Sequence, residues 1–430
     1  MRSTVLAVAG GFVAAAALAY AAVADAERTT RDHATVVAVP VATSVGRSVP
    51  NSAFGAGAAR TKLPRRALRS TWNGRLSTAA IGLVALPEGG LFALSTAGEL
   101  LVVDGSGVDL RGASVGSPAA PPTVLADGTI LYRTNAQNVC GISVGPTGDA
   151  GANSLLPTVS AKPAFCAKVP ATRGPGNVAP APTTGGGALF ADRDALFVTA
   201  GDGTVLARTN VPEGTPAAVA VDGANGYLFS TGASGELIAY AWPFSGELRR
   251  VGGFGGPVEG GVTVARHRAY AVVGGASVVA MDLATGTSAP LVTASNGYFL
   301  GAPAVVPGGV VVLLEVGNRT NALFFDEKGV EIRRWPLGLS NTQQGDAGAD
   351  GGSIPRNVAH AGPLVEDDGS FAFGTPSGVV GVALSDGTVA TLADPPCGPA
   401  AKPIHLISGT PGSFYVACSN GDLERISEGN

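Results

Sequence analysis

The stretch from Gly301 to Gly338, GAPAVVPGGVVVLLEVGNRTNALFFDEKGVEIRRWPLG, decides the fold. Short runs of β-branched and aromatic residues alternate in it with turns rich in Gly, Asn and Asp, a pattern typical of antiparallel strands joined by hairpins. It predicts four strands, which begin at Pro303, Val310, Ala322 and Glu331. One such sheet cannot bury both of its faces, so it must stack on further copies of itself.

Similar units recur along the chain from about Ala79 onward. Each has the length of about 40–45 residues that is typical of a four-stranded propeller blade. After the first unit, every unit opens on a proline: Pro121, Pro182, Pro216, Pro257, Pro303, Pro363 and Pro403. The sequence therefore predicts an all-β protein, a β-propeller of eight four-stranded blades. Seven blades with one misassigned unit is the alternative.

The last unit has only three expected strands before the chain stops at Asn430. A lone strand precedes the first unit, because ALRSTWNG at 67–74 is similar to the EIRRW segment that closes the unit at 331–335. Completing the last blade with this N-terminal strand closes the ring and removes a free sheet edge. Residues 62–430 are therefore expected to form the propeller, with insertions at about 145–182 and 340–359.

The N-terminus has the features of a secretory signal peptide over residues 1–26. Met1 and Arg2 precede an apolar run that ends in Ala24-Asp25-Ala26, a small-residue cleavage site. An uncleaved membrane anchor is the alternative, since the run is nearly long enough to span a bilayer. Residues 27–61 are expected to be a linker. The sequence thus predicts an extracytoplasmic protein, periplasmic or secreted.

The number and the balance of charged residues exclude some classes of binding partner. Charged residues make up 14% of the 430 residues, against about 25% in soluble proteins. The net charge is −4, and no basic stripe is present, so nucleic acid is not expected as a partner. We expect a monomer that binds other proteins of the cell envelope. Contact with a membrane is expected only through an uncleaved N-terminus or through those partners.

Two segments resemble the pyrroloquinoline-quinone-like propeller repeat. APAVVPGGVV at 302–311 is similar to the repeat's opening, and VAMDLATG at 279–286 is similar to its later "LYALDLATG" segment. Members of this family include quinone-dependent dehydrogenases and the non-enzymatic BamB type of the outer-membrane assembly machine. The dehydrogenases carry adjacent cysteines and many tryptophans, whereas this chain has no adjacent cysteines and three tryptophans. The resemblance implies the BamB-like branch without a cofactor, although the lipid-bearing cysteine of that type is absent.

Four cysteines are present: Cys140, Cys166, Cys397 and Cys418. In an exported chain an even number predicts disulfides, and four cysteines allow three connectivities. Pairing of Cys140 with Cys166 and of Cys397 with Cys418 is favoured, because each pair brackets one local excursion of the chain. No Cys-x-x-Cys occurs, so the spacing does not indicate a metal or redox site.

The sequence contains no convincing catalytic or cofactor-binding residues. His360 and His405 are weak candidates for a metal or anion site, because both fall at the start of innermost strands in neighbouring blades. Two solvated residues at the channel mouth are the simpler interpretation, since no third ligand recurs there. We therefore expect a non-catalytic, protein-binding scaffold of the envelope that could act in outer-membrane protein assembly. The alternative is a channel-centred enzyme, either a quinoprotein-like oxidoreductase or a metal-dependent lyase or lactonase.

Overall fold

A computed structural model describes residue 64 and most of the chain from residue 67 to residue 428. The ranges are 67–86, 90–103, 109–111, 116–125, 127–143, 164–212, 214–317, 319–339, 363–365, 369–375, 378, 380–392, 394–398, 401–409 and 412–428. The expected signal peptide, the expected linker and the insertion at 340–359 lie outside these residues. The described part contains strands and turns but no helix, and so no helix in it could span a membrane.

The strands form four-stranded antiparallel sheets, here called blades and numbered in chain order. Blade 1 consists of β2 (Ala80–Ala85), β3 (Leu91–Ser95), β4 (Leu100–Val103) and β5 (Asp109–Arg111). Blade 2 consists of β6 (Thr123–Val124), β7 (Thr129–Arg133), β8 (Asn138–Ser143) and β9 (Phe165–Lys168). Blade 3 consists of β10 (Ala181–Pro182), β11 (Ala188–Ala191), β12 (Ala195–Thr199) and β13 (Val205–Asn210). Blade 4 consists of β14 (Thr215–Asp222), β15 (Asn225–Thr231), β16 (Leu237–Trp242) and β17 (Arg249–Gly253).

The second half of the chain repeats this arrangement. Blade 5 consists of β18 (Val258–Ala265), β19 (Arg268–Val273), β20 (Ser277–Asp282) and β21 (Ser288–Thr293). Blade 6 consists of β22 (Tyr298–Val306), β23 (Gly309–Val316), β24 (Arg319–Asp326) and β25 (Glu331–Leu339). Blade 7 consists of β26 (Leu364–Val365), β27 (Phe371–Gly374), β28 (Val380–Ala383) and β29 (Val389–Thr391). Blade 8 consists of β30 (Pro403–Ser408), β31 (Ser413–Cys418), β32 (Asp422–Glu428) and β1 (Leu68–Arg75).

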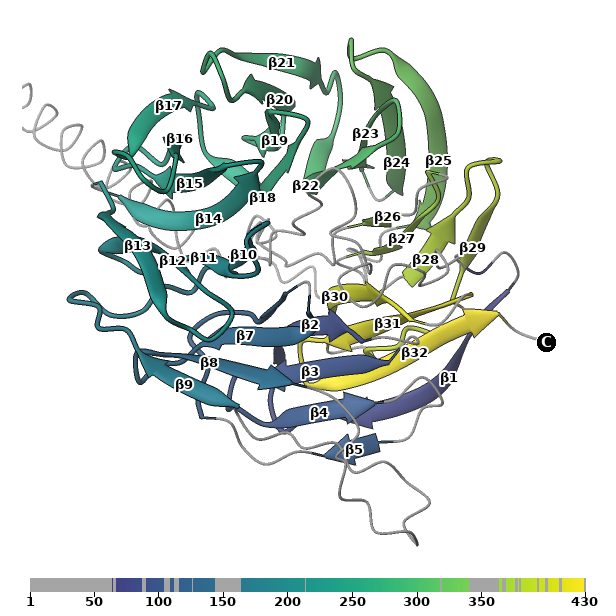
Figure 1. Ribbon diagram of the computed structural model, residues 1–430. Coiled ribbons are helices and arrows are strands. Elements are labelled where there is room, and N and C mark those ends of the chain that lie inside the picture. Colours follow the sequence, from purple (N-terminus) through teal and green to yellow (C-terminus); the bar gives the residue numbers. More distant parts are fainter. Residues whose placement is uncertain are drawn as a thin grey trace, which may run out of the picture. The chain divides into compact units, whose positions relative to one another are not determined.

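The expected eight-bladed propeller is confirmed, and so is its closure. β1 pairs antiparallel with β32, from Leu68 opposite Glu428 to Arg75 opposite Asp422, and is the outermost strand of blade 8. Figure 1 shows this strand, in purple, beside the yellow strands of the C-terminus. The first and last parts of the sequence therefore share one sheet.

Apolar side chains gather between the blades. The described residues contain eight buried clusters, and each joins one blade to the next around the ring. Because a blade is covered on both faces, its second strand is a continuous apolar run rather than an alternating one. β3, β11 and β31 are buried at every residue for this reason. The core is thus a closed series of interfaces.

The expected insertion at 145–182 is shorter than the sequence indicated. β9 and β10 both lie within this segment, so it includes the fourth strand of blade 2 and the first strand of blade 3. β9 has four residues and β10 has two. Because both lie among Pro and Gly, the sequence showed no clear strand pattern there. In the sixth blade, the first strand is longer than the sequence predicted, because β22 begins at Tyr298 and not at Pro303.

Candidate protein interface

His405 is one of the two weak metal candidates, and it is buried in a structural role. It lies on β30, and its Nε2 is 3.2 Å from the carbonyl oxygen of Ala80, the first residue of β2. The contact joins blade 8 to blade 1. Burial lowers the pKa of His405 to about 4, although the hydrogen bond to Ala80 acts in the opposite direction. The imidazole is therefore neutral near pH 7, with Nε2 protonated and donating.

His360, the other weak metal candidate, lies outside the described residues. Within the described part of the chain, no group of three or more His, Cys, Asp or Glu side chains is arranged to hold a metal ion. His267, in the turn between β18 and β19, is exposed, and its Nδ1 is 2.7 Å from a carboxylate oxygen of Asp222. These histidines do not come together as a site.

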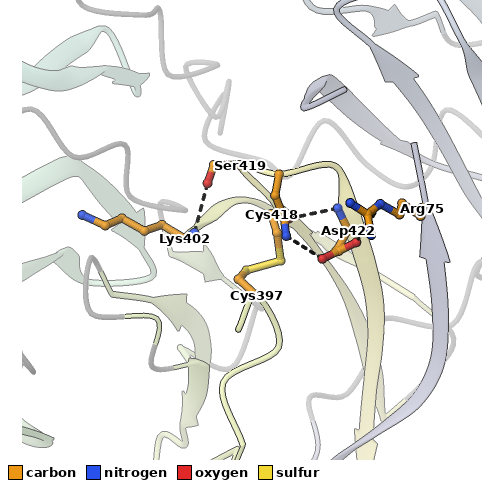
Figure 2. The surroundings of a disulfide bond; sticks show 7 residues. Arg75, Cys397, Lys402, Cys418, Ser419 and Asp422 are labelled. Atoms are coloured by element: carbon orange, nitrogen blue, oxygen red, sulfur yellow. Dashed lines mark hydrogen bonds and ion pairs between the residues drawn. A yellow bond between two sulfur atoms is a disulfide. The ribbon is translucent and has the colours of Figure 1, made fainter. Parts of the chain in front are cut away.

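Disulfides join Cys140 to Cys166 and Cys397 to Cys418, the pairing that the sequence favoured. Figure 2 shows the second of these at the end of β31. There the backbone N–H of Lys402 donates to the Ser419 hydroxyl at 3.1 Å, and the N–H of Ser419 donates to the carbonyl of Lys402 at 2.9 Å. This disulfide ties the connection that enters blade 8 to the second strand of that blade.

The sequence did not single out the most buried charged pair. Arg133, at the end of β7, is 1% exposed, and Asp192, which follows β11, is 0% exposed. Arg133 donates from Nε to one Asp192 carboxylate oxygen at 3.1 Å and from Nη2 to the other at 2.6 Å. Nη2 also donates to the carbonyl of Val169 at 2.7 Å, and the guanidinium lies 5.4 Å from the ring centre of Phe197.

Arg133 and Asp192 therefore fasten blade 2 to blade 3. One signal in the sequence pointed to them: each is a charged residue that closes or directly follows the apolar second strand of its blade. An isolated charge in that position of a buried run must be paired or hydrogen-bonded. The sequence could not show that the two charges face each other.

A groove between blades 3 and 4 is the feature best suited to binding another molecule. Its volume is about 460 Å³. One wall is Arg208 to Pro212, which covers the end of β13 and the residues after it. The other wall is Trp242 and the turn residues Phe244 to Leu248, which join β16 to β17. Figure 1 shows β13 and β17 as the outermost strands of blades 3 and 4, with β16 next to β17.

Aromatic side chains fix the shape of this groove. The indole Nε1 of Trp242 donates to the carbonyl of Gly246 at 3.0 Å and so holds the turn against the strand. The rings of Trp242 and Phe244 meet edge to face, with their centres 5.4 Å apart. Phe244 has a φ of 53°, a left-handed conformation that is costly for a bulky residue. Packing of its ring outweighs that cost.

Gly226 shows why Phe244 can pack in this way. A Cβ at Gly226 would lie 2.8 Å from the ring of Phe244 and 2.8 Å from the side chain of Leu189 in blade 3. The absence of a side chain there lets the phenyl ring reach the apolar cluster between the two blades. The groove wall is therefore rigid, and it was not predictable from any single segment of sequence.

The edge of blade 3 adjoins the groove. β13 is the outermost strand of its sheet, and no other strand of the described residues pairs with its outer edge. The groove thus combines apolar and aromatic walls, the charged groups Arg208 and Glu247, and unpaired backbone groups of a strand. These are the elements with which proteins bind an extended segment of a partner.

Comparisons with known proteins agree on the fold. No protein-family model matches the chain, and no curated protein is similar to it in sequence. Among solved structures, BamB from Moraxella catarrhalis is 13% identical, with a TM-score of 0.53 and coverage of 84% of this chain and 97% of that one. The computationally designed Ika8 protein is 12% identical, with a TM-score of 0.58 and coverage of 86% and 100%.

The C-terminal WD40 domain of Sif2 is a third similar structure. It is 11% identical, with a TM-score of 0.57 and coverage of 85% of this chain and 99% of that one. All three are similar along nearly the whole of their own length. At identities this low the likeness bears on architecture and not on activity, and it agrees with the sheet order described above: the chain is an eight-bladed β-propeller.

Proposed function

We propose that this chain is an exported, non-catalytic scaffold that binds other proteins of the cell envelope, as a BamB-like member of the pyrroloquinoline-quinone-like propellers. The groove between blades 3 and 4 carries the proposal. One of its walls contains the paired aromatic rings of Trp242 and Phe244. Aromatic and arginine side chains supply most of the binding energy at protein interfaces.

Export has independent support. Two disulfides use all four cysteines, and such bonds persist in oxidising compartments. The apolar run before Ala26 has the composition of a signal peptide. BamB is also among the similar solved structures, and the segments at 279–286 and 302–311 resemble the pyrroloquinoline-quinone-like propeller repeat. A role in outer-membrane protein assembly is the more specific part of this proposal.

An extended partner segment fits the groove better than a small ligand. The groove is open along β13, whose unpaired edge can accept a further strand. Strand addition supplies affinity through backbone hydrogen bonds, and a side chain of the partner would enter the groove beside Phe244. The insertion between β8 and β9 and the insertion expected at 340–359 remain further candidates, because long loops on a rigid scaffold commonly carry recognition.

The test is site-specific photo-crosslinking in the native envelope. A photoreactive residue is placed at Asn210, which is exposed in the groove, and at Ala289, which is exposed on the outermost strand of blade 5. We expect a discrete crosslinked protein from position 210 and none from position 289. The same partner should be lost from an Asn210→Arg chain and kept by an Ala289→Arg chain. Equal crosslinking from both positions would exclude the groove as the interface.

A second experiment tests whether the partner binds to the groove or to the insertions. Both insertions are shortened, folding is checked by circular dichroism, and crosslinking from position 210 is repeated. An unchanged partner assigns binding to the groove, whereas loss of the partner assigns it to the insertions. Stoichiometric quinone or metal in the purified protein, with turnover that His360→Ala or His405→Ala abolishes, would overturn the scaffold proposal itself.

A further inference from the structure

The two disulfides lie in opposite environments. Cys397 is 3% exposed and Cys418 is 0% exposed, and the second lies under the turn that Figure 2 shows between β31 and β32. Cys140 is likewise 1% exposed, but its partner Cys166 is exposed on the outermost strand of blade 2. One disulfide therefore joins two buried residues, and the other joins a buried residue to an exposed one.

We propose that Cys140–Cys166 is a thiol-exchange site, at which an external thiol forms a mixed disulfide with Cys166. Disulfides that are exposed tend to be the labile or regulatory ones, while buried disulfides resist reduction. The inference depends on the described strands alone and does not require the proposed scaffold function.

The pairing of β8 with β9 places the two cysteines of this disulfide in different surroundings. Cys140 and Cys166 lie directly opposite each other in the antiparallel register, so both side chains are on the same face of the sheet. The Cys140 sulfur points into the apolar cluster between blades 1 and 2, with Phe92, Tyr132 and Ile142. Residues of β9 alternate between half-buried and exposed, which leaves Cys166 and Lys168 outward.

An attacking thiolate can therefore reach only one sulfur. It approaches the Sγ of Cys166 in line with the S–S bond and forms a new S–S bond there. The bond to Cys140 breaks, and its electron pair goes to the Sγ of Cys140, which takes up a proton from solvent. With a dithiol, the second thiol then attacks the mixed disulfide, so that the dithiol is oxidised and both cysteines are released as thiols.

The residues around the disulfide influence attack at the Sγ of Cys166. Lys168 lies two residues from Cys166 on the same face, roughly 7 Å along the strand, but its Nζ donates to the carbonyl of Ala136, so its positive charge attracts an anionic thiolate only at long range. The apolar cluster disfavours a charged Cys140, which slows its departure as a thiolate, but the thiol that forms on protonation also returns slowly as a nucleophile. A mixed disulfide at Cys166 should therefore persist long enough to be isolated.

The wild-type protein contains its own control, because both disulfides are present in one molecule. The folded protein is incubated with a graded series of dithiothreitol concentrations, quenched with an alkylating reagent and mapped by peptide mass. We expect Cys140 and Cys166 to be labelled at least about tenfold faster than Cys397 and Cys418. Incubation with glutathione should add one glutathione on Cys166 and none on Cys140. Equal labelling of the two disulfides, or an adduct on Cys140, would overturn the proposal.

Single variants give a measurement that does not depend on reduction. Cys140→Ser leaves one thiol at position 166, and Cys166→Ser leaves one at position 140. In chains shown by circular dichroism to be folded, the thiol at 166 should react with a maleimide at least about tenfold faster than the thiol at 140. Equal rates would show that β9 does not present Cys166 to solvent, and the proposed site would then be rejected.

Discussion

Arg133 and Asp192 show how much one buried contact can contribute to a propeller. The pair is almost fully removed from solvent, and the backbone N–H of Gly176 adds a third hydrogen bond to the carboxylate, at 3.2 Å. Arg133 has one group, Nη1, without a hydrogen-bond partner among the described residues. A buried ion pair of this kind adds little net stability, but removal of one partner leaves an uncompensated charge.

We therefore expect Arg133→Met to destabilise the protein by about 3–5 kcal/mol. Burial of the unpaired Asp192 carboxylate is the cause, since methionine keeps most of the side-chain volume. The measurement is the free energy of unfolding from urea titration. The double variant Arg133→Met, Asp192→Leu removes both charges and should recover most of the loss. If the double variant is as unstable as the two single effects added together, the pair is not coupled.

His405 gives the stability of the ring a dependence on pH. The pKa of His405 is about 4 in the folded protein and about 6.5 when unfolded, so the unfolded state binds the extra proton first. The stability contributed by the neutral imidazole is complete above pH 6.5 and is lost as pH falls towards 4. The difference of 6.5 − 4 = 2.5 in pKa corresponds to about 3 kcal/mol.

We expect the free energy of unfolding of the wild type to fall between pH 6.5 and pH 4.5, and that of His405→Gln to fall less. Glutamine does not titrate, and its amide can still donate to the carbonyl of Ala80. His267→Gln is the matched control, because it makes the same substitution at a histidine that is exposed. A wild-type slope retained in His405→Gln would assign the pH dependence to other groups.

Single residues also explain why the sequence predicted the fold better than the site. Proline at the start of each unit and Gly or Asp in each turn are local signals, and the turns form as expected. At Asp202-Gly203, for example, the Asp202 carboxylate accepts from the N–H of Thr204 at 2.9 Å, and Gly203 has a φ of 82°. The groove depends instead on Trp242, Phe244 and Gly226 meeting residues of another blade, and no local pattern encodes that meeting.

Among the elements, β1 has the most consequential position. Its sequence similarity to the closing strand of the sixth unit was enough to place it in blade 8, about 350 positions from its partner β32. Trp72 is half-buried, with its ring edge to face with that of Tyr415 and the ring centres 6.2 Å apart. The strand lies at the outside of the blade, where one face of the indole remains in solvent.

Removal of residues 67–76 should expose the edge of β32 and cause aggregation, because an unpaired strand edge recruits other chains. Removal of residues 27–50 is the control and should leave the protein soluble. The measurement is size-exclusion chromatography with light scattering at several concentrations. Should both truncated chains behave alike, β1 is not needed to cover the edge.

The half-buried state of Trp72 lowers the expected effect of its removal. Trp72→Ala should cost about 2–3 kcal/mol, below the range typical of a fully buried aromatic. Gly74→Ala offers a second test, since a Cβ at this position would overlap the indole ring of Trp72. We expect the two changes to lower the urea midpoint and to be less than additive, because both act on the same ring. Full additivity would contradict the contact.

At the scale of the whole molecule, the described residues form eight similar interfaces, and the one between blades 8 and 1 closes the ring. The cluster between blades 8 and 1 contains Leu76, Leu91, Tyr415 and Leu423, and the hydrogen bond from His405 to Ala80 crosses the same boundary. The connection from β1 to β2 adds a covalent tie across it. Closure therefore has two separable parts, which are coverage of the edge of β32 and covalent attachment of blade 8 to blade 1.

A circular permutant separates these two parts. Leu68 pairs with Glu428, so Gly429 and Asn430 can serve as a two-residue hairpin loop that leads from β32 directly into β1. The permuted chain begins at residue 77, runs to Asn430 and continues with residues 68–76. It keeps every strand of blade 8 but loses the covalent tie to blade 1.

We expect this permutant to stay monomeric, because the edge of β32 is still covered, and to have a lower urea midpoint than the wild type, because blades 8 and 1 then meet only through side chains. It should also fold faster, since pairing of β1 with β32 no longer requires closure of a loop that spans nearly the whole propeller. Light scattering, urea titration and stopped-flow fluorescence measure the three effects. Aggregation of the permutant would show that coverage of the edge requires the covalent tie, and an unchanged midpoint would show that the interface between blades 8 and 1 closes the ring without it.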